Sequence, residues 1–236
     1  MRCYNHDMKV VKIHAVQSIA LQSLLNATRA RYSELRRAAG VESDIFKFHI
    51  KKLQLQHYVI KAEDGLYELT AEGKEYASNL DMRGTEIAQP RSSMLMIVRY
   101  GKRIIGHRRD REPYNQFWGI ASAPLLRGVP AVISAHREFE KQVGISAEFR
   151  VHGVFRVIDK DERGKILEDK LFSVMVADVD KMSEPHSWYG GFSQWMDVDD
   201  LLSKKRLFPT TRATLEMIER GETFREQICV YRDDEY

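Results

Sequence analysis

Three polar side chains near the middle of the chain have the types and spacing for phosphate or metal chemistry. Glu138, Lys141 and Gln142 follow one another at i, i+3 and i+4, so on a helix they share one face. A helix is expected because Pro130 suits a first helical turn and Gly144 suits the residue just past a helix end. A carboxylate there is a ligand for a divalent cation, whereas a lysine holds a phosphate directly.

The other side of this helix is apolar. Val132, Ile133, His136, Phe139 and Val143 recur at steps of three and four residues, which is the pattern of a buried helix face. We therefore expect these five side chains to pack against the core.

The stretch from Trp118 to Ile145 resembles the Nudix box, the loop–helix–loop of Nudix hydrolases with the pattern G-x5-E-x7-R-E-U-x-E-E-x-G-U, where U is aliphatic or aromatic. The matching residues are Arg137, Glu138, Phe139, Gly144 and Ile145. The resemblance implies an α/β/α sandwich and a site that binds metal and diphosphate. It also implies that Arg137 orients the loop backbone by hydrogen bonds.

The departures from the box fall on its metal ligands. Ala123 replaces the first Gly, Val129 replaces the first Glu, and Lys141 and Gln142 replace the paired Glu residues. A lysine ammonium has no lone pair and repels a cation. We therefore expect no metal and no cofactor, with Glu138 as a weak metal candidate.

The alternative is a divergent hydrolase that uses Mg²⁺ or Mn²⁺, in which Glu138 is catalytic. Metals in such a site polarise the phosphoryl oxygens and activate the attacking water. Glu168, Asp169 and Glu184 are further carboxylates, but nothing in their spacing favours one of them.

A sharper hypothesis is that Lys141 takes the place of the cation and holds the phosphate of a nucleotide or nucleotide-sugar without cleaving it. Arg108, Arg109 or Arg111 would lie near the phosphate, and Phe117 or Trp118 could stack on a base. The candidate ligand-binding residues are Lys141, Gln142, Arg108, Arg109, Arg137 and Trp118. The competing interpretation is that Lys141 is solvent-exposed, pairs with Glu138, and that Trp118 belongs to the core.

The composition is that of an ordinary globular protein. The 236 residues are 43% hydrophobic and 30% charged, with a net charge of +3, and no apolar run approaches the roughly 20 residues of a membrane helix. Residues 1–7 lack the apolar core of a signal peptide. The two cysteines, Cys3 and Cys229, have no metal-like spacing. We expect free or buried thiols and a cytoplasmic protein without membrane contact.

The first 80 residues predict short helices around a hairpin. Helical spacing runs over residues 16–31, then over 34–39 with Ser33 as N-cap and Gly40 as the end, then over 44–57 with Ser43 as N-cap. Strands over 59–63 and 66–69 flank a two-residue Asp64-Gly65 turn. Thr70 caps a last helix that ends near residue 80.

This order resembles the winged helix-turn-helix of bacterial transcription regulators, over about residues 12–80. Phe46, Ile50 and Leu53 of the third helix are expected to face the core. The predicted DNA-binding residues are Ser43, Asp44, Lys47, Phe48, Lys51 and Lys52. Lysines contact phosphates, and residues near the start of the helix meet base edges.

Three observations weigh against this DNA-binding interpretation or limit it. Lys51 and Lys52 also suit a solvated face, the acidic wing tip of Glu63 and Asp64 repels phosphates, and a winged helix also serves as a protein-contact module. His49 is expected to be a packed, hydrogen-bonded core residue rather than a metal ligand.

The expected organisation is two domains. Residues 1–80 form the winged helix, mainly α with a β-hairpin wing, residues 81–90 a linker, and residues 91–236 an α/β/α Nudix-like sandwich with a mixed sheet. In the sandwich we expect strands at 94–99, 104–109, 149–157 and 169–179. A strand at 193–197 then leads into a short helix at 198–203, and Pro209 opens a final helix.

The favoured function is a DNA-binding transcriptional regulator whose Nudix-like domain senses a nucleotide or nucleotide-sugar. The chain resembles the Nudix-related repressors that sense metabolites such as ADP-ribose, although those carry the DNA-binding module at the C-terminus. A homodimer is expected from operator symmetry. Besides the hydrolase alternative, a scaffold with neither activity remains open.

Overall fold

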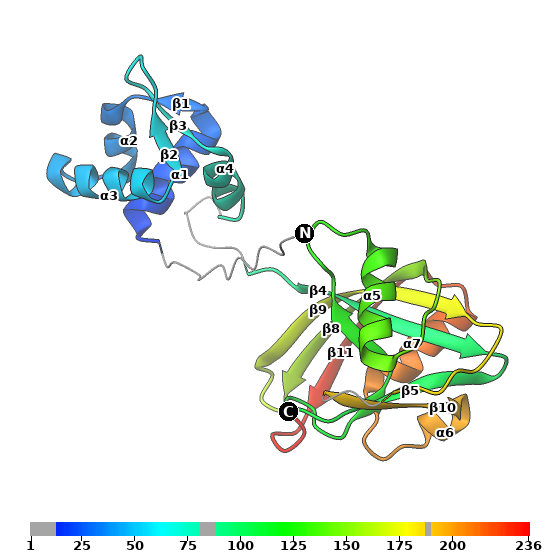
Figure 1. The fold of residues 1–236 in the computed structure, drawn as a ribbon. Helices are drawn as coiled ribbons and strands as arrows, with labels where there is room; N and C mark the ends of the chain where they lie inside the picture. Colours follow the sequence, from blue (N-terminus) through cyan, green and yellow to red (C-terminus); the bar gives the residue numbers. More distant parts are fainter. Residues whose placement is uncertain (1–12, 81–87, 187–189) are drawn as a thin grey trace. The chain divides into compact units, whose positions relative to one another are not determined.

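The structure is a computed structural model that describes residues 13–80, 88–186 and 190–236. The chain splits into two compact units, Met1–Ala88 and Gln89–Tyr236, which are described separately (Figure 1). Most of the predicted linker, 81–90, lies outside the described residues. Among the helices of the described part, none is long and apolar enough to cross a membrane.

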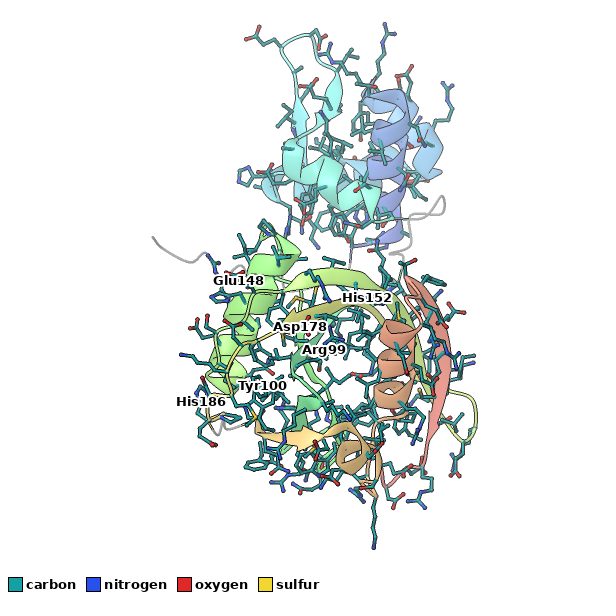
Figure 2. The ribbon with its side chains drawn as sticks, turned by 90° about the vertical axis from the view of Figure 1, so that its right-hand side faces the viewer. Arg99, Tyr100, Glu148, His152, Asp178 and His186 are labelled. Atoms are coloured by element: carbon teal, nitrogen blue, oxygen red, sulfur yellow. The ribbon has the colours of Figure 1, made fainter. Side chains whose placement is uncertain are left out.

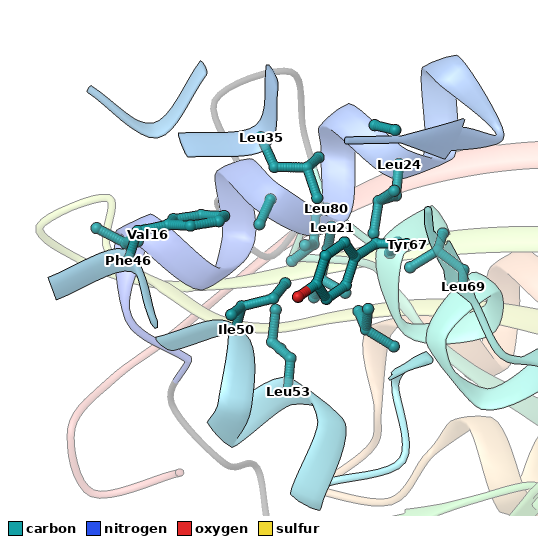
Figure 3. Packing of buried hydrophobic residues seen from close by; sticks show 14 residues of the cluster. Val16, Leu21, Leu24, Leu35, Phe46, Ile50, Leu53, Tyr67, Leu69 and Leu80 are labelled. Carbon is teal, nitrogen blue, oxygen red and sulfur yellow. The ribbon is translucent and has the colours of Figure 1, made fainter. Parts of the chain in front are cut away.

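The first unit packs helices around a small antiparallel sheet of order β1-β3-β2. Its elements are α1 (Ala15–Ala27), β1 (Arg29–Ala30), α2 (Tyr32–Ala39), α3 (Ser43–Leu55), β2 (Val59–Lys61), β3 (Tyr67–Leu69) and α4 (Ala71–Ser78). The predicted inward face of α3 is confirmed, because Phe46, Ile50 and Leu53 are buried. They pack against Leu21 and Leu24 of α1 (Figure 3).

Two local predictions in this unit are wrong. Ser33 does not cap α2, because the helix begins at Tyr32 and the Glu34 carboxylate accepts a hydrogen bond from the Arg31 N–H at 2.7 Å. Ser43 likewise is the first residue of α3 and not its cap. By contrast, Thr70 caps α4 as predicted, with its hydroxyl oxygen 2.9 Å from the Gly73 nitrogen.

The hairpin turn is one residue longer than predicted. Gly65 N–H donates to the Ala62 carbonyl at 2.9 Å and Ala62 N–H donates to the Leu66 carbonyl at 2.8 Å, so the loop holds three residues. Gly65 has a φ of +82°, which glycine adopts without steric cost. The sequence signal also missed β1, which extends the hairpin into a three-stranded sheet.

The second unit is built on a mixed sheet of order β10-β5-β4-β9-β8-β11. Its elements are β4 (Arg91–Tyr100), β5 (Arg103–Arg109), β6 (Trp118–Gly119), β7 (Ala121–Pro124), α5 (Ala131–Val143), β8 (Arg150–Asp161), β9 (Ile166–Asp178), β10 (Gly191–Asp197), α6 (Val198–Leu202), α7 (Pro209–Glu219) and β11 (Phe224–Tyr231). The pairs β4–β9 and β8–β11 are parallel and the others are antiparallel. Strand β11 was not predicted.

The sheet is covered on both faces. Helices α5 and α7 lie on opposite sides of it (Figure 2). Alternation along β4 explains why: Met94 and Met96 point into the cluster that contains α5, while Leu95 and Ile97 point into the cluster that contains α7. Near the sheet's end, Arg99 donates to Asp178 at 2.8 Å, which ties β4 to β9 and holds the pKa of the Asp178 carboxyl below its usual value.

The buried face of α5 differs from the predicted one. Phe139 and Val143 are fully buried as expected, but Val132 and Ile133 are 40% and 42% exposed. Small buried residues, Ser134 and Ala135, take their place. Because Ser134 and Ala135 are small, the first turns of α5 can lie close to the sheet. Val132 and Ile133 then lie at the side of this contact and stay partly exposed.

Candidate functional site

The polar face of α5 is not arranged as a ligand site. Gln142 is buried, and its Nε2 donates to the Ser122 carbonyl oxygen at 3.2 Å. Lys141 is exposed and Glu138 is half-buried. The buried amide therefore ties α5 to β7, a bond that an ionised carboxylate cannot make because it has no donor.

Two further predictions for this helix are wrong. Within the described residues no ion pair joins Glu138 to Lys141; Glu140 instead lies beside His136, with a nitrogen–oxygen distance of 3.8 Å. Arg137 is exposed and makes no hydrogen bond within the described part of the chain, so it does not orient the loop backbone here. Its side chain points away from the core because the inward positions belong to Phe139 and Gln142.

The α5 face also does not fit a magnesium or manganese ion. These ions need several oxygen ligands, and Glu138 is a lone carboxylate beside an ammonium and an amide already engaged with Ser122. Across residues 13–80, 88–186 and 190–236, no group of three or more His, Cys, Asp or Glu side chains is placed to hold a metal ion. We therefore derive no metal-dependent step.

Trp118 and Arg108 belong to a different cluster. The Arg108 guanidinium lies 5.9 Å from the Trp118 ring centroid and 5.4 Å from that of Phe192. It is also paired with Asp110, with a nitrogen–oxygen distance of 2.8 Å. Lys204 Nζ lies 4.9 Å from the Trp118 ring centroid. Cation–π contacts with the protein's own side chains thus occupy the indole, which is half-buried and packs against the cluster of Ile104, Met196 and Leu201.

A cavity lies on the other side of the sheet, facing α7. It has a volume of about 170 Å³ and is lined by β4, the end of β5 and the segment after it, β7, β8, β9, β11 and α7. Of the predicted ligand-binding residues, only Arg109 lines it, joined by Arg111. The side chains of Arg108 and Arg109 lie on opposite faces of the sheet, because neighbouring residues of a strand point to opposite sides.

Charged side chains form a chain across this cavity. Lys170 Nζ lies 2.5 Å from Oδ2 of Asp159 and 2.8 Å from Oε2 of Glu168. Arg91 continues the chain, with its guanidinium 3.3 Å from Oε1 of Glu168. Tyr114 donates its hydroxyl to Asp159 at 2.7 Å, and burial together with this carboxylate raises the pKa of Tyr114 well above its usual value.

Asp159 keeps one acceptor unused. The residue is 1% exposed, and its Oδ1 has no hydrogen-bond partner among the described residues. A buried carboxylate oxygen without a donor costs free energy, so this atom can accept a hydrogen bond from one further donor in the cavity. The residues lining the cavity also include four cations, Arg91, Arg109, Arg111 and Lys170, against the carboxylates Asp159 and Glu168. This excess of positive charge favours an anionic ligand.

Sequence reasoning missed most of this cavity. The sequence offers Glu168 only as a carboxylate without an assigned place, and no motif singles out Asp159, Lys170 or Tyr114. One signal was present: Phe155, Val157 and Asp159 alternate along β8, so the aspartate falls on the buried side. Of the other two candidate carboxylates, Asp169 pairs with Arg156 at 3.0 Å, and Glu184 is exposed.

The predicted DNA-binding residues gather on the outer face of α3. Ser43, Asp44, Lys47, Phe48, Lys51 and Lys52 are all exposed. The acidic wing is partly neutralised, because Arg29 lies 2.9 Å from the Asp64 carboxylate and 3.0 Å from that of Glu68. The predicted repulsion of phosphates by the wing is weakened accordingly.

His49 is packed but not fully hydrogen-bonded. It is 9% exposed and stacks on His14 with ring centroids 4.3 Å apart. Its Nδ1 has no partner in the described part of the chain, so the expectation of a satisfied histidine is wrong for that atom. Burial, with the nearby His14 and Lys52, lowers the pKa of His49.

Solved structures of Nudix hydrolases are similar to part of the chain. No protein-family model and no curated protein matches the sequence. A MutT NUDIX hydrolase from Burkholderia pseudomallei is 26% identical, with a TM-score of 0.48 over 56% of this chain and 99% of that one. The NUDIX domain of Shewanella oneidensis NrtR, complexed with ADP ribose, is 13% identical, with a TM-score of 0.48 over 65% of this chain and 97% of that one.

An Ap4A hydrolase from C. elegans is also 13% identical, with a TM-score of 0.43 over 55% of this chain and 96% of that one. These similarities are of Nudix structures, in line with the α/β/α layering of the second unit. Because the TM-scores lie below 0.5, they decide neither ligand nor activity.

Proposed function

We propose that the protein is a DNA-binding transcriptional regulator whose Nudix-like unit binds a nucleotide or nucleotide-sugar without cleaving it. The observation that carries the proposal is the cavity beside Arg109. It combines an excess of positive charge with a buried acceptor on Asp159 that has no hydrogen-bond partner among the residues that the structure describes. A nucleotide offers both complements: anionic phosphates, and N–H donors on base or O–H donors on sugar.

The size of the cavity limits how such a ligand sits. About 170 Å³ is less than the roughly 300 Å³ at the lower end of ordinary ligand pockets. Only part of a nucleotide is therefore enclosed, and its phosphates lie toward the more exposed side chains of Arg91, Arg109 and Arg111. A base or ribose group reaches inward, toward Asp159 and Tyr114.

The α5 face supports binding without cleavage. In the Nudix resemblance that helix supplies several carboxylates for metal on one face, and here the corresponding face supplies Glu138 alone, because Glu140 lies beside His136. Gln142 is committed to Ser122, and Lys141 points to solvent. The domain thus keeps the fold and has the groups for binding, without the ligand set for metal-assisted hydrolysis.

The proposed DNA contact is made by the first unit as a winged helix. Lys47, Lys51 and Lys52 on α3 reach phosphates, and Arg29 offsets the acidic wing. A homodimer would present two such units to a two-fold symmetric operator.

Ligand binding is tested by thermal unfolding of the full chain with a panel of nucleoside diphosphate compounds, ADP-ribose first. A ligand that binds the native state raises stability by about 2.7 kcal/mol at 100 times its Kd. We expect stabilisation of the wild type, a Kd at least tenfold weaker in Arg109→Met, and no change in Lys141→Met. If Lys141→Met weakens binding and Arg109→Met does not, the ligand lies on α5 and the cavity assignment is wrong.

DNA binding is tested by duplex affinity as a function of salt. Each phosphate contact contributes about 0.9 to the slope of log K against log salt. We expect a slope that falls by about 1 in Lys51→Ala and is unchanged in Lys181→Ala, a matched exposed lysine of the second unit. A protein that binds no duplex at low salt is not a DNA-binding regulator.

A further inference from the structure

We propose that Phe48 reads the C5-methyl group of thymine in the major groove, which makes it a specificity residue of α3. This inference rests on the proposed DNA-binding function of the first unit. Phe48 is 64% exposed although it is large and apolar. An exposed phenyl ring on the outer face of a helix is available for contact with a partner, and its neighbours indicate which kind of partner it fits.

The position of Phe48 on α3 places it among polar and cationic side chains. Asp44 and Ile45 lie one turn before it, and Lys51 and Lys52 lie one turn after it, at i±3 and i±4. All four are exposed. The core side chains of α3 occupy the opposite face, so this group forms a single outward surface, the α3 outer face.

The charges of the α3 outer face favour DNA over a protein partner. The cores of protein–protein interfaces are depleted of lysine, yet Lys51 and Lys52 directly follow the phenyl ring along the helix. Lysines suit phosphates at the edges of a groove. An apolar side chain between them meets the floor of the groove, where the thymine methyl is the apolar group on display.

The ring is also held in place. Phe48 packs edge-on against His49, with ring centroids 5.2 Å apart, and His49 stacks in turn on His14 at 4.3 Å. The buried histidine thus supports the exposed phenyl ring. A ring that is already ordered loses little side-chain entropy on binding, which suits a residue that discriminates between bases by a single methyl group.

Ile45 adds a second apolar contact on the same side, being 49% exposed. Asp44 restricts the orientation of the helix further: its carboxylate repels phosphates, so it faces base edges, where it accepts from the amino group of cytosine. The α3 outer face therefore fits a pyrimidine-containing stretch with at least one thymine under Phe48.

The test is the replacement of thymine by uracil, which removes only the methyl group. Duplexes bound by the full-length wild-type protein are first selected from a random pool. Each thymine of the selected duplex is then replaced singly by dU, and the Kd is measured for wild type, Phe48→Ala, Phe48→Leu and Leu55→Ala. Leu55 is the matched control, because it is 72% exposed and lies at the end of the same helix.

We expect one position at which dU weakens wild-type binding by about fourfold, the effect of one methyl-sized group removed from contact. Phe48→Ala should bind the dT and dU duplexes equally, whereas Phe48→Leu and Leu55→Ala should keep the preference for dT. The salt dependence should be the same in all four proteins. Equal discrimination by wild type and Phe48→Ala, or none by either, overturns the inference.

Two other outcomes are distinguishable. If no protein binds duplex DNA, the proposed function itself fails and the inference fails with it. If Phe48→Ala leaves the preference for dT intact but dissociates an oligomer of the wild type, the α3 outer face is a protein interface and the inference is wrong.

Discussion

Gln142 Nε2 lies 3.2 Å from the Ser122 carbonyl oxygen and donates a hydrogen bond to it from a buried position. The Nudix box has a glutamate at this place, and a glutamate cannot donate. With an amide in place of a carboxylate, residue 142 connects α5 to β7 by a hydrogen bond, at the position where the Nudix box has a metal ligand. It is the clearest local reason to separate the fold of this unit from the reaction associated with that fold.

This hydrogen bond predicts that restoring the box residue destabilises the protein. Gln142→Glu places a carboxylate against a carbonyl oxygen in a buried site, at a cost of about 1–3 kcal/mol. Denaturant unfolding followed by tryptophan fluorescence measures this, because all three tryptophans, Trp118, Trp188 and Trp195, belong to the second unit. The exposed Lys141→Glu should stay within about 0.5 kcal/mol of the wild type. Equal stabilities of Gln142→Glu and wild type would contradict the structural role.

The ion pair between Lys170 and Asp159, which line the cavity, predicts that the effects of substituting these two residues on the free energy of unfolding are strongly coupled. Lys170 is largely buried and its partner Asp159 is nearly inaccessible, so Lys170→Met leaves a buried negative charge and costs about 3–5 kcal/mol. Adding Asp159→Asn removes that charge and keeps an acceptor for Tyr114. The double variant should recover at least half of the loss in the same fluorescence assay, and additive losses would show that the two groups act independently.

His107 predicts a loss of stability in mild acid. Burial lowers its pKa to about 4, and its Nδ1 lies 2.9 Å from the Ser193 hydroxyl. In the unfolded chain the ring takes a proton near the ordinary histidine pKa of 6.5, so between pH 6.5 and 4 the unfolded state binds more protons and stability falls as pH falls. Above pH 6.5 the residue has no effect.

Over that window the His107 contribution is on the order of 3 kcal/mol. His107→Gln should flatten the pH dependence of the unfolding free energy between pH 6.5 and 4. His136→Gln is the matched control on α5, because that ring is more exposed. An unchanged pH slope in His107→Gln would show that the ring does not stay neutral in the folded protein.

Arg29 predicts an electrostatic effect of the wing on DNA affinity. Its guanidinium lies between the carboxylates of Asp64 and Glu68, so Arg29→Ala exposes two negative charges. We expect duplex binding to weaken about three- to fivefold at low salt, in line with the strength of exposed ion pairs, and less at high salt. Adding Asp64→Asn should restore part of the affinity, and Lys74→Ala on α4 is a control of equal charge change.

Periodicity predicted the elements well where one face is clearly apolar. The inward set Phe46, Ile50 and Leu53, the cap at Thr70 and the helix start at Pro209 all follow from local rules of spacing and capping. The face of α5 did not follow, because the sheet selects the small Ser134 and Ala135 for close approach over Val132 and Ile133. That choice depends on the partner surface, which periodicity does not contain.

The cavity could not be predicted from local sequence patterns, because residues far apart in the sequence form it. Its walls come from strands and a helix spread over more than 120 residues of sequence, from Arg91 to Tyr231. Asp159 and Glu168 meet because β8 and β9 pair with those two residues in register, and Lys170 bridges them. The Nudix resemblance predicts a site on α5, whereas in this chain the charged cavity faces α7.

The most direct test of the account is to follow ADP-ribose through binding in the presence of Mg²⁺. The full chain is titrated calorimetrically, and the nucleotide recovered from the cell is then resolved by chromatography. The account predicts saturable binding that Arg109→Met weakens at least tenfold, with the ADP-ribose recovered intact. Conversion to AMP and ribose 5-phosphate, at a rate abolished by Glu138→Gln, would contradict it and identify a hydrolase.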